Sequence, residues 1–144
     1  MHIAFGSLIK QTDKNFEWII VDDGSSDNTE EIVNNFINDK VLNIRYFKQE
    51  NGGKHRAINR GVKEALGELF FIVDSDDTLP ENSLELIDKY ANMITADDVV
   101  GVCGLKATKD TLVGKTFKGK TKILPAKNGN ASNMLGAIAP FLNE

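Results

Sequence analysis

Three acidic side chains gather directly after an apolar run near the middle of the chain. Residues 70–73 are Phe, Phe, Ile and Val, and they lead into Asp74, Asp76 and Asp77. A run of this kind predicts a buried strand, Leu69–Val73, whose carboxyl end carries the acids. Carboxylates this close repel one another unless a cation lies among them, and oxygen ligands suit Mg²⁺ or Mn²⁺. The pattern therefore indicates a divalent metal ion that accompanies a phosphate-bearing substrate.

A second acidic pair follows an earlier apolar run in the same manner. Residues 18–21 lead into Asp22 and Asp23, and a Gly-Ser turn comes next. A carboxylate at a strand end can accept hydrogens from a nucleobase or a ribose. If the two strands are parallel, both acidic groups lie at the carboxyl edge of one sheet, where open α/β sheets bind ligands. The alternative for this segment is a turn that only caps the following helix.

The segment Gly52-Gly53-Lys54 precedes a predicted helix. Backbone N–H groups at such a helix start, together with the lysine, favour a phosphate contact. A plain connecting loop explains the same residues equally well, so this signal is weaker than the acidic clusters.

Strands and helices are expected to alternate along the first 105 residues. Asp27 and Glu30 fit a capping box for one helix, Pro80 suits the first turn of another, and Leu66 closes the inward stripe of a third. Alternation of this kind predicts an α/β fold with a mostly parallel sheet. The expected strands are 17–21, 44–47, 69–73 and 99–105, and the expected helices are 3–10, the segment after Asp27, 54–66 and the segment after Pro80.

Composition limits the classes of protein that need to be considered. The chain has 144 residues and a net charge of −4, made up of −9 over residues 1–100 and +5 over residues 101–144. Its apolar runs are too short to cross a bilayer, and a lone cysteine, Cys103, excludes an internal disulfide. The lysines of 106–127 could meet phosphates or an anionic membrane face, but a solvated hairpin over 106–123 is the simpler interpretation. Without interleaved aromatic residues, nucleic acid is not an expected partner. We therefore expect two regions, 1–105 and a basic C-terminal tail, 106–144.

The motifs taken together resemble the nucleotide-binding half of a family 2 glycosyltransferase of the GT-A fold. The resemblance covers about residues 5–105, and the motifs appear in the family's order and spacing. The matching segments are 7–12 (Ser-Leu-Ile-Lys-Gln-Thr), 16–29 (with Val-Asp-Asp-Gly-Ser), 51–54 (Asn-Gly-Gly-Lys) with Ala57 and Asn59, and 74–77 (Asp-Ser-Asp-Asp).

This resemblance implies transfer of a sugar from a nucleotide-diphosphate donor, commonly a UDP-sugar, to an acceptor hydroxyl with Mn²⁺ or Mg²⁺. By the motif match, Asp23 reads the uracil with Asp22 beside it, and Lys54 contacts the nucleotide. Asp74 lies near the ribose and donor sugar, and Asp76 holds the metal, with Asp77 as the alternative ligand. The family further implies a carbohydrate or lipid-linked acceptor. It also implies a cytoplasmic location, with peripheral contact at the inner membrane face, in polysaccharide biosynthesis.

The chain departs from the family pattern in two places. Family members normally begin with a central strand before the helix that matches residues 3–12, whereas this chain starts inside that helix. We therefore expect a truncated domain, or an oligomer in which another chain completes the sheet. Downstream of residue 105 the only acids are Asp110 and Glu144, neither in a matching context, so no catalytic base is assigned.

Other interpretations of the same residues remain open. A truncated module that binds the nucleotide-sugar without catalysis fits the motifs as well as an enzyme does. A haloacid dehalogenase-type phosphohydrolase would use Asp74 as nucleophile and Asp76 as general acid. A two-component receiver would bind Mg²⁺ at Asp22 and Asp23 and accept phosphate on Asp74. The last two match the remaining motifs poorly.

Overall fold

The computed structural model describes residues 1–95, 106–107 and 112–113. The chain divides into two compact units: one comprises Lys14–Phe70, and the other joins Met1–Asp13 to Phe71–Glu144. The predicted strand 99–105, Cys103 and the proposed boundary at residue 105 lie outside the described residues. The two-region division at that boundary stays a prediction.

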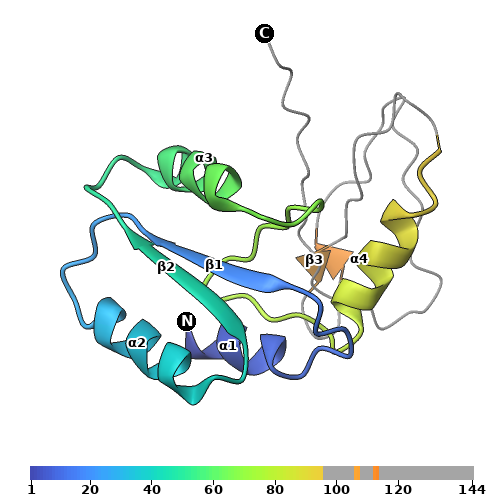
Figure 1. Cartoon of the computed structure of the whole chain (residues 1–144), viewed down its shortest axis with the longest axis horizontal. Helices are drawn as coiled ribbons and strands as arrows, with labels where there is room; N and C mark the ends of the chain where they lie inside the picture. Colours follow the sequence, from blue (N-terminus) through green and yellow to red (C-terminus); the bar gives the residue numbers. More distant parts are fainter. Residues whose placement is uncertain (96–105, 108–111, 114–144) are drawn as a thin grey trace, which may run out of the picture. The chain divides into compact units, whose positions relative to one another are not determined.

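The unit Lys14–Phe70 contains two parallel strands with a helix on each side (Figure 1). Strand β1 (Glu17–Asp22) pairs with β2 (Asn43–Lys48), and helix α2 (Thr29–Asp39) connects them. Helix α3 (Lys54–Glu64) follows β2. Both strands start and end in register, Glu17 opposite Asn43 and Asp22 opposite Lys48, so their carboxyl ends meet at one edge. The predicted strands 17–21 and 44–47 and their parallel arrangement are confirmed.

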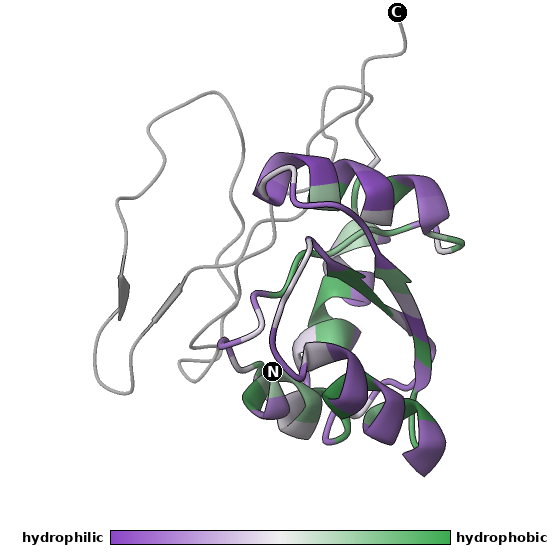
Figure 2. Ribbon diagram, turned by 90° about the vertical axis from the view of Figure 1, so that its left-hand side faces the viewer, coloured by the Kyte–Doolittle hydropathy of each residue, from purple (hydrophilic) through white to green (hydrophobic). Residues whose placement is uncertain are grey.

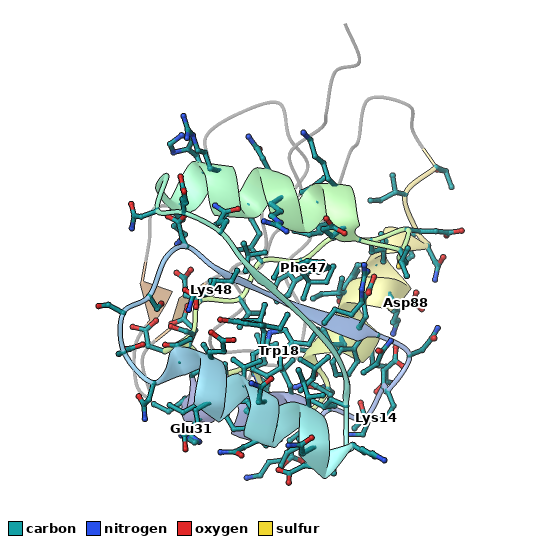
Figure 3. The ribbon with its side chains drawn as sticks, turned by 60° about the vertical axis from the view of Figure 1, so that its left-hand side comes forward. Lys14, Trp18, Glu31, Phe47, Lys48 and Asp88 are labelled. Atoms are coloured by element: carbon teal, nitrogen blue, oxygen red, sulfur yellow. The ribbon has the colours of Figure 1, made fainter. Side chains whose placement is uncertain are left out.

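Each face of this strand pair packs against a different helix, as the two-residue period of a strand requires. Trp18 of β1 stacks on Phe36 of α2, with the ring centroids 6.2 Å apart. Phe47 of β2 lies instead on the α3 side, where the Arg60 guanidinium sits 5.4 Å from its ring centroid (Figure 3). Gly61 of α3 is buried and faces β1, where an added Cβ would make an ordinary contact with the Val21 side chain at 3.7 Å.

Helix α2 begins one residue later than the predicted capping box requires. Its N-cap is Asn28, whose side chain makes no cap hydrogen bond. The Asp27 carboxylate accepts instead from the backbone N–H of Thr29 at 3.0 Å and from its hydroxyl at 2.6 Å. The capping-box prediction with Glu30 is therefore wrong, because Asp27 satisfies the first helical residue from one position further out.

Helix α3 ends at Glu64, so the prediction that Leu66 points inward is also wrong. Leu66 is 81% exposed, and its backbone N–H donates to the Glu17 carboxylate at 2.6 Å. Arg45 joins the same network: it bonds Glu17 at 3.0 Å and the Glu64 carbonyl at 2.5 Å. With these polar bonds at its end, α3 stops at Glu64, before the last residues of the predicted apolar stripe.

The described part of the second unit contains two helices and a short antiparallel strand pair. These are α1 (His2–Leu8), α4 (Ser83–Ala91), β3 (Lys106–Ala107) and β4 (Leu112–Val113). Among the described residues of this unit, the buried apolar side chains are those of Ala4, Leu8, Leu79 and Ile87. The β3–β4 pair agrees with a hairpin inside 106–123. Helix α4 has Asn82 as its N-cap, so Pro80 precedes the helix rather than opening its first turn. Within the described ranges, no helix has both the length and the apolar character needed to cross a membrane.

The predicted strand Leu69–Val73 does not form among the described residues. Leu69 is 44% exposed, and residues 70–73 are half-buried without regular secondary structure. A strand requires ladder hydrogen bonds to a neighbour, and apolar, β-favouring composition alone does not supply them. The expectation that the carboxyl end of this strand carries the three acids therefore also fails.

Candidate active site

The carboxyl end of β1 turns sharply around the buried side chain of Asp22. This residue is only 4% exposed, and its two carboxylate oxygens accept from two groups of the same unit. The Ser25 backbone N–H donates to Oδ1 at 2.7 Å, which closes the turn, and the Tyr46 hydroxyl donates to Oδ2 at 2.6 Å. Burial alone would raise the pKa of Asp22, but the hydrogen bonds from Tyr46 and Ser25 outweigh it and lower that pKa. Asp22 is therefore an ionised, internally satisfied anchor of the turn.

Asp23, the next residue, ties the turn after β1 to the loop after β2. Its Oδ1 accepts from the Gln49 amide at 2.7 Å and from the Gly52 N–H at 3.0 Å, and its Oδ2 accepts from the Gly53 N–H at 2.7 Å. These donors, Gln49 first, lower the pKa of Asp23. The sequence suggested that the two glycine N–H groups contact a phosphate. In the structure they donate to Asp23 instead.

Glycine is required where these two segments touch. Gly24 has a φ of +82°, and a Cβ added there would lie 2.8 Å from the Asn51 backbone nitrogen. Gly53 also has positive φ, at +90°, immediately before α3. Side chains at these positions would be strained by the backbone conformation, and at Gly24 also by a clash. The turn after β1 and the loop after β2 are thus built as one rigid edge.

Several exposed side chains of helix α3 are positively charged. Lys54 opens the helix and is exposed, as are His55, Arg56 and Lys63. Figure 2 shows α3 coloured hydrophilic over most of its length. Lys54 thus follows directly after the Gly52–Gly53 loop that Asp23 holds, where an anionic ligand of that edge could meet it.

The acidic cluster of the second unit lies on a tight turn. The Asp77 backbone N–H donates to the Asp74 carbonyl at 3.0 Å, so Ser75 and Asp76 form the exposed tip of this turn. Asp74 and Asp77 are half-buried at its two ends. The three predicted acids thus lie on a turn and not at the end of a strand.

The six predicted site residues thus belong to two units. Asp22, Asp23 and Lys54 belong to Lys14–Phe70, and the acidic turn 74–77 belongs to the other unit. The turn at Asp22 and Asp23 and the acidic turn are each ordered by hydrogen bonds within their own unit.

The acidic turn has the donor chemistry of a magnesium or manganese site. Across the described residues, no group of three His, Cys, Asp or Glu side chains is placed to hold a metal ion. Mg²⁺ commonly binds through one or two carboxylates and the phosphates of its substrate, without a protein cage. Asp74, Asp76 and Asp77 suit that mode, with the exposed Asp76 as the most accessible donor.

Sequence reasoning missed two side chains that order the site. Tyr46 and Gln49 hold Asp22 and Asp23, respectively. In the observed register Asp22 is opposite Lys48, so Tyr46 lies two residues earlier on the same face of β2. Knowing this strand register would have identified Tyr46 as a partner of Asp22, but the register is known only once the strands are paired in the structure.

Comparison with known proteins identifies the family. The family model described as "Glycosyl transferase family 2" matches residues 2–142, nearly the whole chain. The chain belongs to the family 2 glycosyltransferases. This membership confirms the resemblance carried by the acidic turns, and the phosphohydrolase and receiver interpretations are set aside.

Similar proteins in the family extend the comparison. Glycosyltransferase GlyG of Streptococcus pneumoniae is 43% identical over 95 residues, which are 65% of this chain and 31% of GlyG. An uncharacterized glycosyltransferase of Rickettsia typhi is 39% identical over 104 residues, covering 72% of this chain and 31% of that protein.

A solved structure shows the same fold. The crystal structure of S. aureus TarS in complex with UDP superposes with a TM-score of 0.66 and 29% identity, over 79% of this chain and 34% of TarS. The GT-A-like α/β fold expected from the sequence is confirmed. The chain spans about a third of the length of these relatives.

Proposed function

We propose that this chain forms the donor-binding part of a glycosyltransferase that moves a sugar from a nucleotide-diphosphate donor, a UDP-sugar, to an acceptor hydroxyl. The observation that carries the proposal is the locked edge of β1 and β2, where Asp23 accepts from Gln49, Gly52 and Gly53. Family membership over residues 2–142 and the likeness to TarS, which was solved with UDP, support the same activity.

Asp23 is the proposed reader of the nucleobase. Its lowered pKa keeps the carboxylate ionised at neutral pH, so it can accept an N–H such as that of uracil. Asp22 supports this role indirectly, because its buried carboxylate closes the turn that carries Asp23. Lys54, exposed at the start of α3, is proposed to contact the nucleotide through its positive charge.

The acidic turn is the proposed metal site. A bound Mn²⁺ or Mg²⁺ would offset the negative charge that develops on the departing diphosphate. Asp76 at the tip of the turn is the proposed ligand, with Asp77 as the alternative, and Asp74 is proposed to lie near the ribose and donor sugar. The hydrogen bond from the Asp77 N–H to the Asp74 carbonyl keeps these carboxylates within one turn.

The wider biological setting follows the family. We propose a carbohydrate or lipid-linked acceptor in polysaccharide biosynthesis, with the protein in the cytoplasm or in peripheral contact with the inner membrane face. A second chain that completes the sheet is part of the same proposal. The lysine-rich region 106–127 supports the membrane contact by its charge alone.

Calorimetric titration of UDP into the 144-residue chain, with and without Mn²⁺, tests the proposal. We expect binding that Mn²⁺ strengthens, and we expect Asp76→Asn to remove the Mn²⁺-dependent part because the exposed ligand is lost. Asp88→Asn on α4 is the matched control, since it makes the same chemical change in the same unit. If Asp76→Asn binds UDP with Mn²⁺ as well as the wild type, the metal assignment is wrong.

Turnover separates an enzyme from a binding module. The module is the second candidate, because the chain spans about a third of its relatives. Hydrolysis or transfer of a UDP-sugar by the chain would establish catalysis. Binding of UDP and Mn²⁺ without turnover would show that the chain is a binding module without catalysis.

A further inference from the structure

Gln11 is a buried polar side chain that none of the proposed roles uses. It is 2% exposed, and it lies just after α1, in the same unit as the acidic turn. Its Nε2 donates to the Pro80 carbonyl at 2.7 Å and to the Ser7 carbonyl at 3.2 Å. Its Oε1 accepts from the Leu84 N–H at 3.1 Å. Gln11 therefore bonds the end of α1 to the start of α4 and to the segment before it.

Thr12 makes a second connection beside the first. Its backbone N–H donates to the Glu81 carbonyl at 2.7 Å, and its hydroxyl donates to the Glu85 carboxylate at 2.9 Å. Two successive residues therefore hold the chain on either side of the α4 N-cap. The Pro80 carbonyl also accepts from the Ser83 backbone N–H at 3.1 Å, so Gln11 adds a second donor at the turn that leads into α4.

The segment held in this way is the downstream support of the acidic turn. Only Thr78 and Leu79 separate Asp77 from Pro80, and Leu79 is 6% exposed among the apolar side chains of this unit. Upstream, residues 70–73 lack the strand that the sequence predicted. The buried Leu79 and the bonds of Gln11 and Thr12 therefore support the turn from its C-terminal side.

We propose that Gln11 and Thr12 are positioning residues for the carboxylates of Asp76 and Asp77, and that they act through Pro80 and Glu81. The inference rests on the proposed function, because it assumes that the acidic turn binds the metal ion of the donor. Oxygen ligands must be held close to the productive geometry before the ion and diphosphate arrive. Groups that orient metal ligands in this way typically alter metal affinity by about 10–100-fold when removed.

Gln11→Met tests the inference, because methionine keeps the length and volume of the side chain without its hydrogen bonds. We expect the Mn²⁺-dependent UDP affinity to fall by about tenfold. We expect the affinity for UDP without metal to change less than twofold, because Asp23 and its partners belong to the other unit. A purely structural role would lower both affinities together through loss of folded protein.

Val33→Ala provides the matched control for stability. Val33 is fully buried on α2 in the other unit, so its truncation destabilises the protein while every residue of the unit that holds segment 79–85 stays unchanged. At equal loss of stability, this variant should keep the metal-dependent gain in affinity. An equal loss of that gain in Val33→Ala would overturn the positioning role.

Thr12→Val and Thr12→Ser keep the test decisive if Gln11→Met does not fold. Valine removes the bond to Glu85, which is exposed, whereas serine retains the hydroxyl. We expect a reduced metal-dependent affinity for Thr12→Val and restoration by Thr12→Ser. Equal affinities for both variants and the wild type would contradict the role of Thr12.

Amide hydrogen exchange gives a readout that needs no ligand. Loss of the Gln11 bonds should speed exchange at the Asp77 N–H, which closes the acidic turn, and at the Leu84 N–H. Unchanged exchange at Asp77 in Gln11→Met would overturn the inference. If wild type binds UDP and Mn²⁺ but Gln11→Met binds them equally well, the inference alone fails. If the wild type binds neither UDP nor Mn²⁺, both the proposed function and the inference fail. Faster exchange in Gln11→Met would then show only that Gln11 stabilises the fold near α4.

Discussion

Replacing Tyr46 with phenylalanine should reveal how strongly its hydrogen bond to the buried Asp22 carboxylate stabilises the edge where β1 and β2 end. The Tyr46 hydroxyl donates to Oδ2 of Asp22 at 2.6 Å, and Asp22 is only 4% exposed, so water cannot easily replace the lost donor. A hydrogen bond to a charged group contributes about 1.5–3 kcal/mol to stability. We therefore expect Tyr46→Phe to lower the free energy of unfolding by about 2 kcal/mol at pH 7.

The loss should depend on pH with a defined sign. Burial raises the pKa of Asp22, but the hydrogen bonds from Tyr46 and Ser25 prevail, and the pKa in the folded protein lies below its ordinary value. The stabilisation is therefore fully present above the unfolded pKa of about 3.9 and is lost as pH falls through the folded pKa. Once Asp22 is protonated, only a neutral hydrogen bond of about 1 kcal/mol separates the two proteins. The difference between wild type and Tyr46→Phe should thus narrow from pH 7 to pH 3.

Urea unfolding followed by tryptophan fluorescence measures this difference directly. Trp18 is the single tryptophan of the chain, and it lies on β1 in the same unit as Asp22. Tyr90→Phe is the control, because it removes the same hydroxyl from α4 in the other unit. A loss below about 0.5 kcal/mol, which is the range of ordinary surface substitutions, would refute the reasoning. So would a loss of equal size at both pH values, or an equal loss in Tyr90→Phe.

Further predictions concern two glycines and a buried serine, each measured as a shift in the urea midpoint. Gly24→Ala should destabilise the protein by about 1–3 kcal/mol, because φ is +82° and the new Cβ would lie 2.8 Å from Asn51. Gly6→Ala, within α1 where an added Cβ meets no atom within 4 Å, should stabilise it by up to about 1 kcal/mol, and the same sign at both glycines would contradict the argument. Ser83→Ala should be neutral or stabilising by about 1 kcal/mol, because its fully buried hydroxyl has no partner within the described residues, and a clear loss would indicate an ordered water bound there.

The elements that sequence periodicity predicted well are those whose partners lie nearby in the chain. The strands β1 and β2 and the helix α2 between them form one β-α-β unit, and alternation with a Gly-Ser turn after β1 was sufficient to place them. The run 69–73 has equally strong apolar character, yet it forms no strand among the described residues. Its state depends on pairing with a distant segment, which local composition does not encode.

The acidic side chains were found from sequence, but most of their supporting partners were not. Asp23 was predicted to bind a ligand from its place after an apolar run, whereas its partner Gln49 lies 26 residues away and is one polar residue among many. Gln11 lies 69 residues from Pro80, and no periodic pattern relates them. Hydrogen bonds at such separations follow from strand register and helix packing, so only the folded chain reveals them.

The partners of Asp23 bear on how the proposed base recognition would work. A carboxylate offers about four acceptor positions, and three are taken, two on Oδ1 by Gln49 and Gly52 and one on Oδ2 by Gly53. The remaining position on Oδ2 can accept one N–H. The same three donors lower the pKa of Asp23, so this position does not acquire a proton near neutral pH and cannot become a donor. A base that presents an N–H is therefore favoured over one that presents only an acceptor. The donors of the loop after β2 establish this preference before any ligand binds.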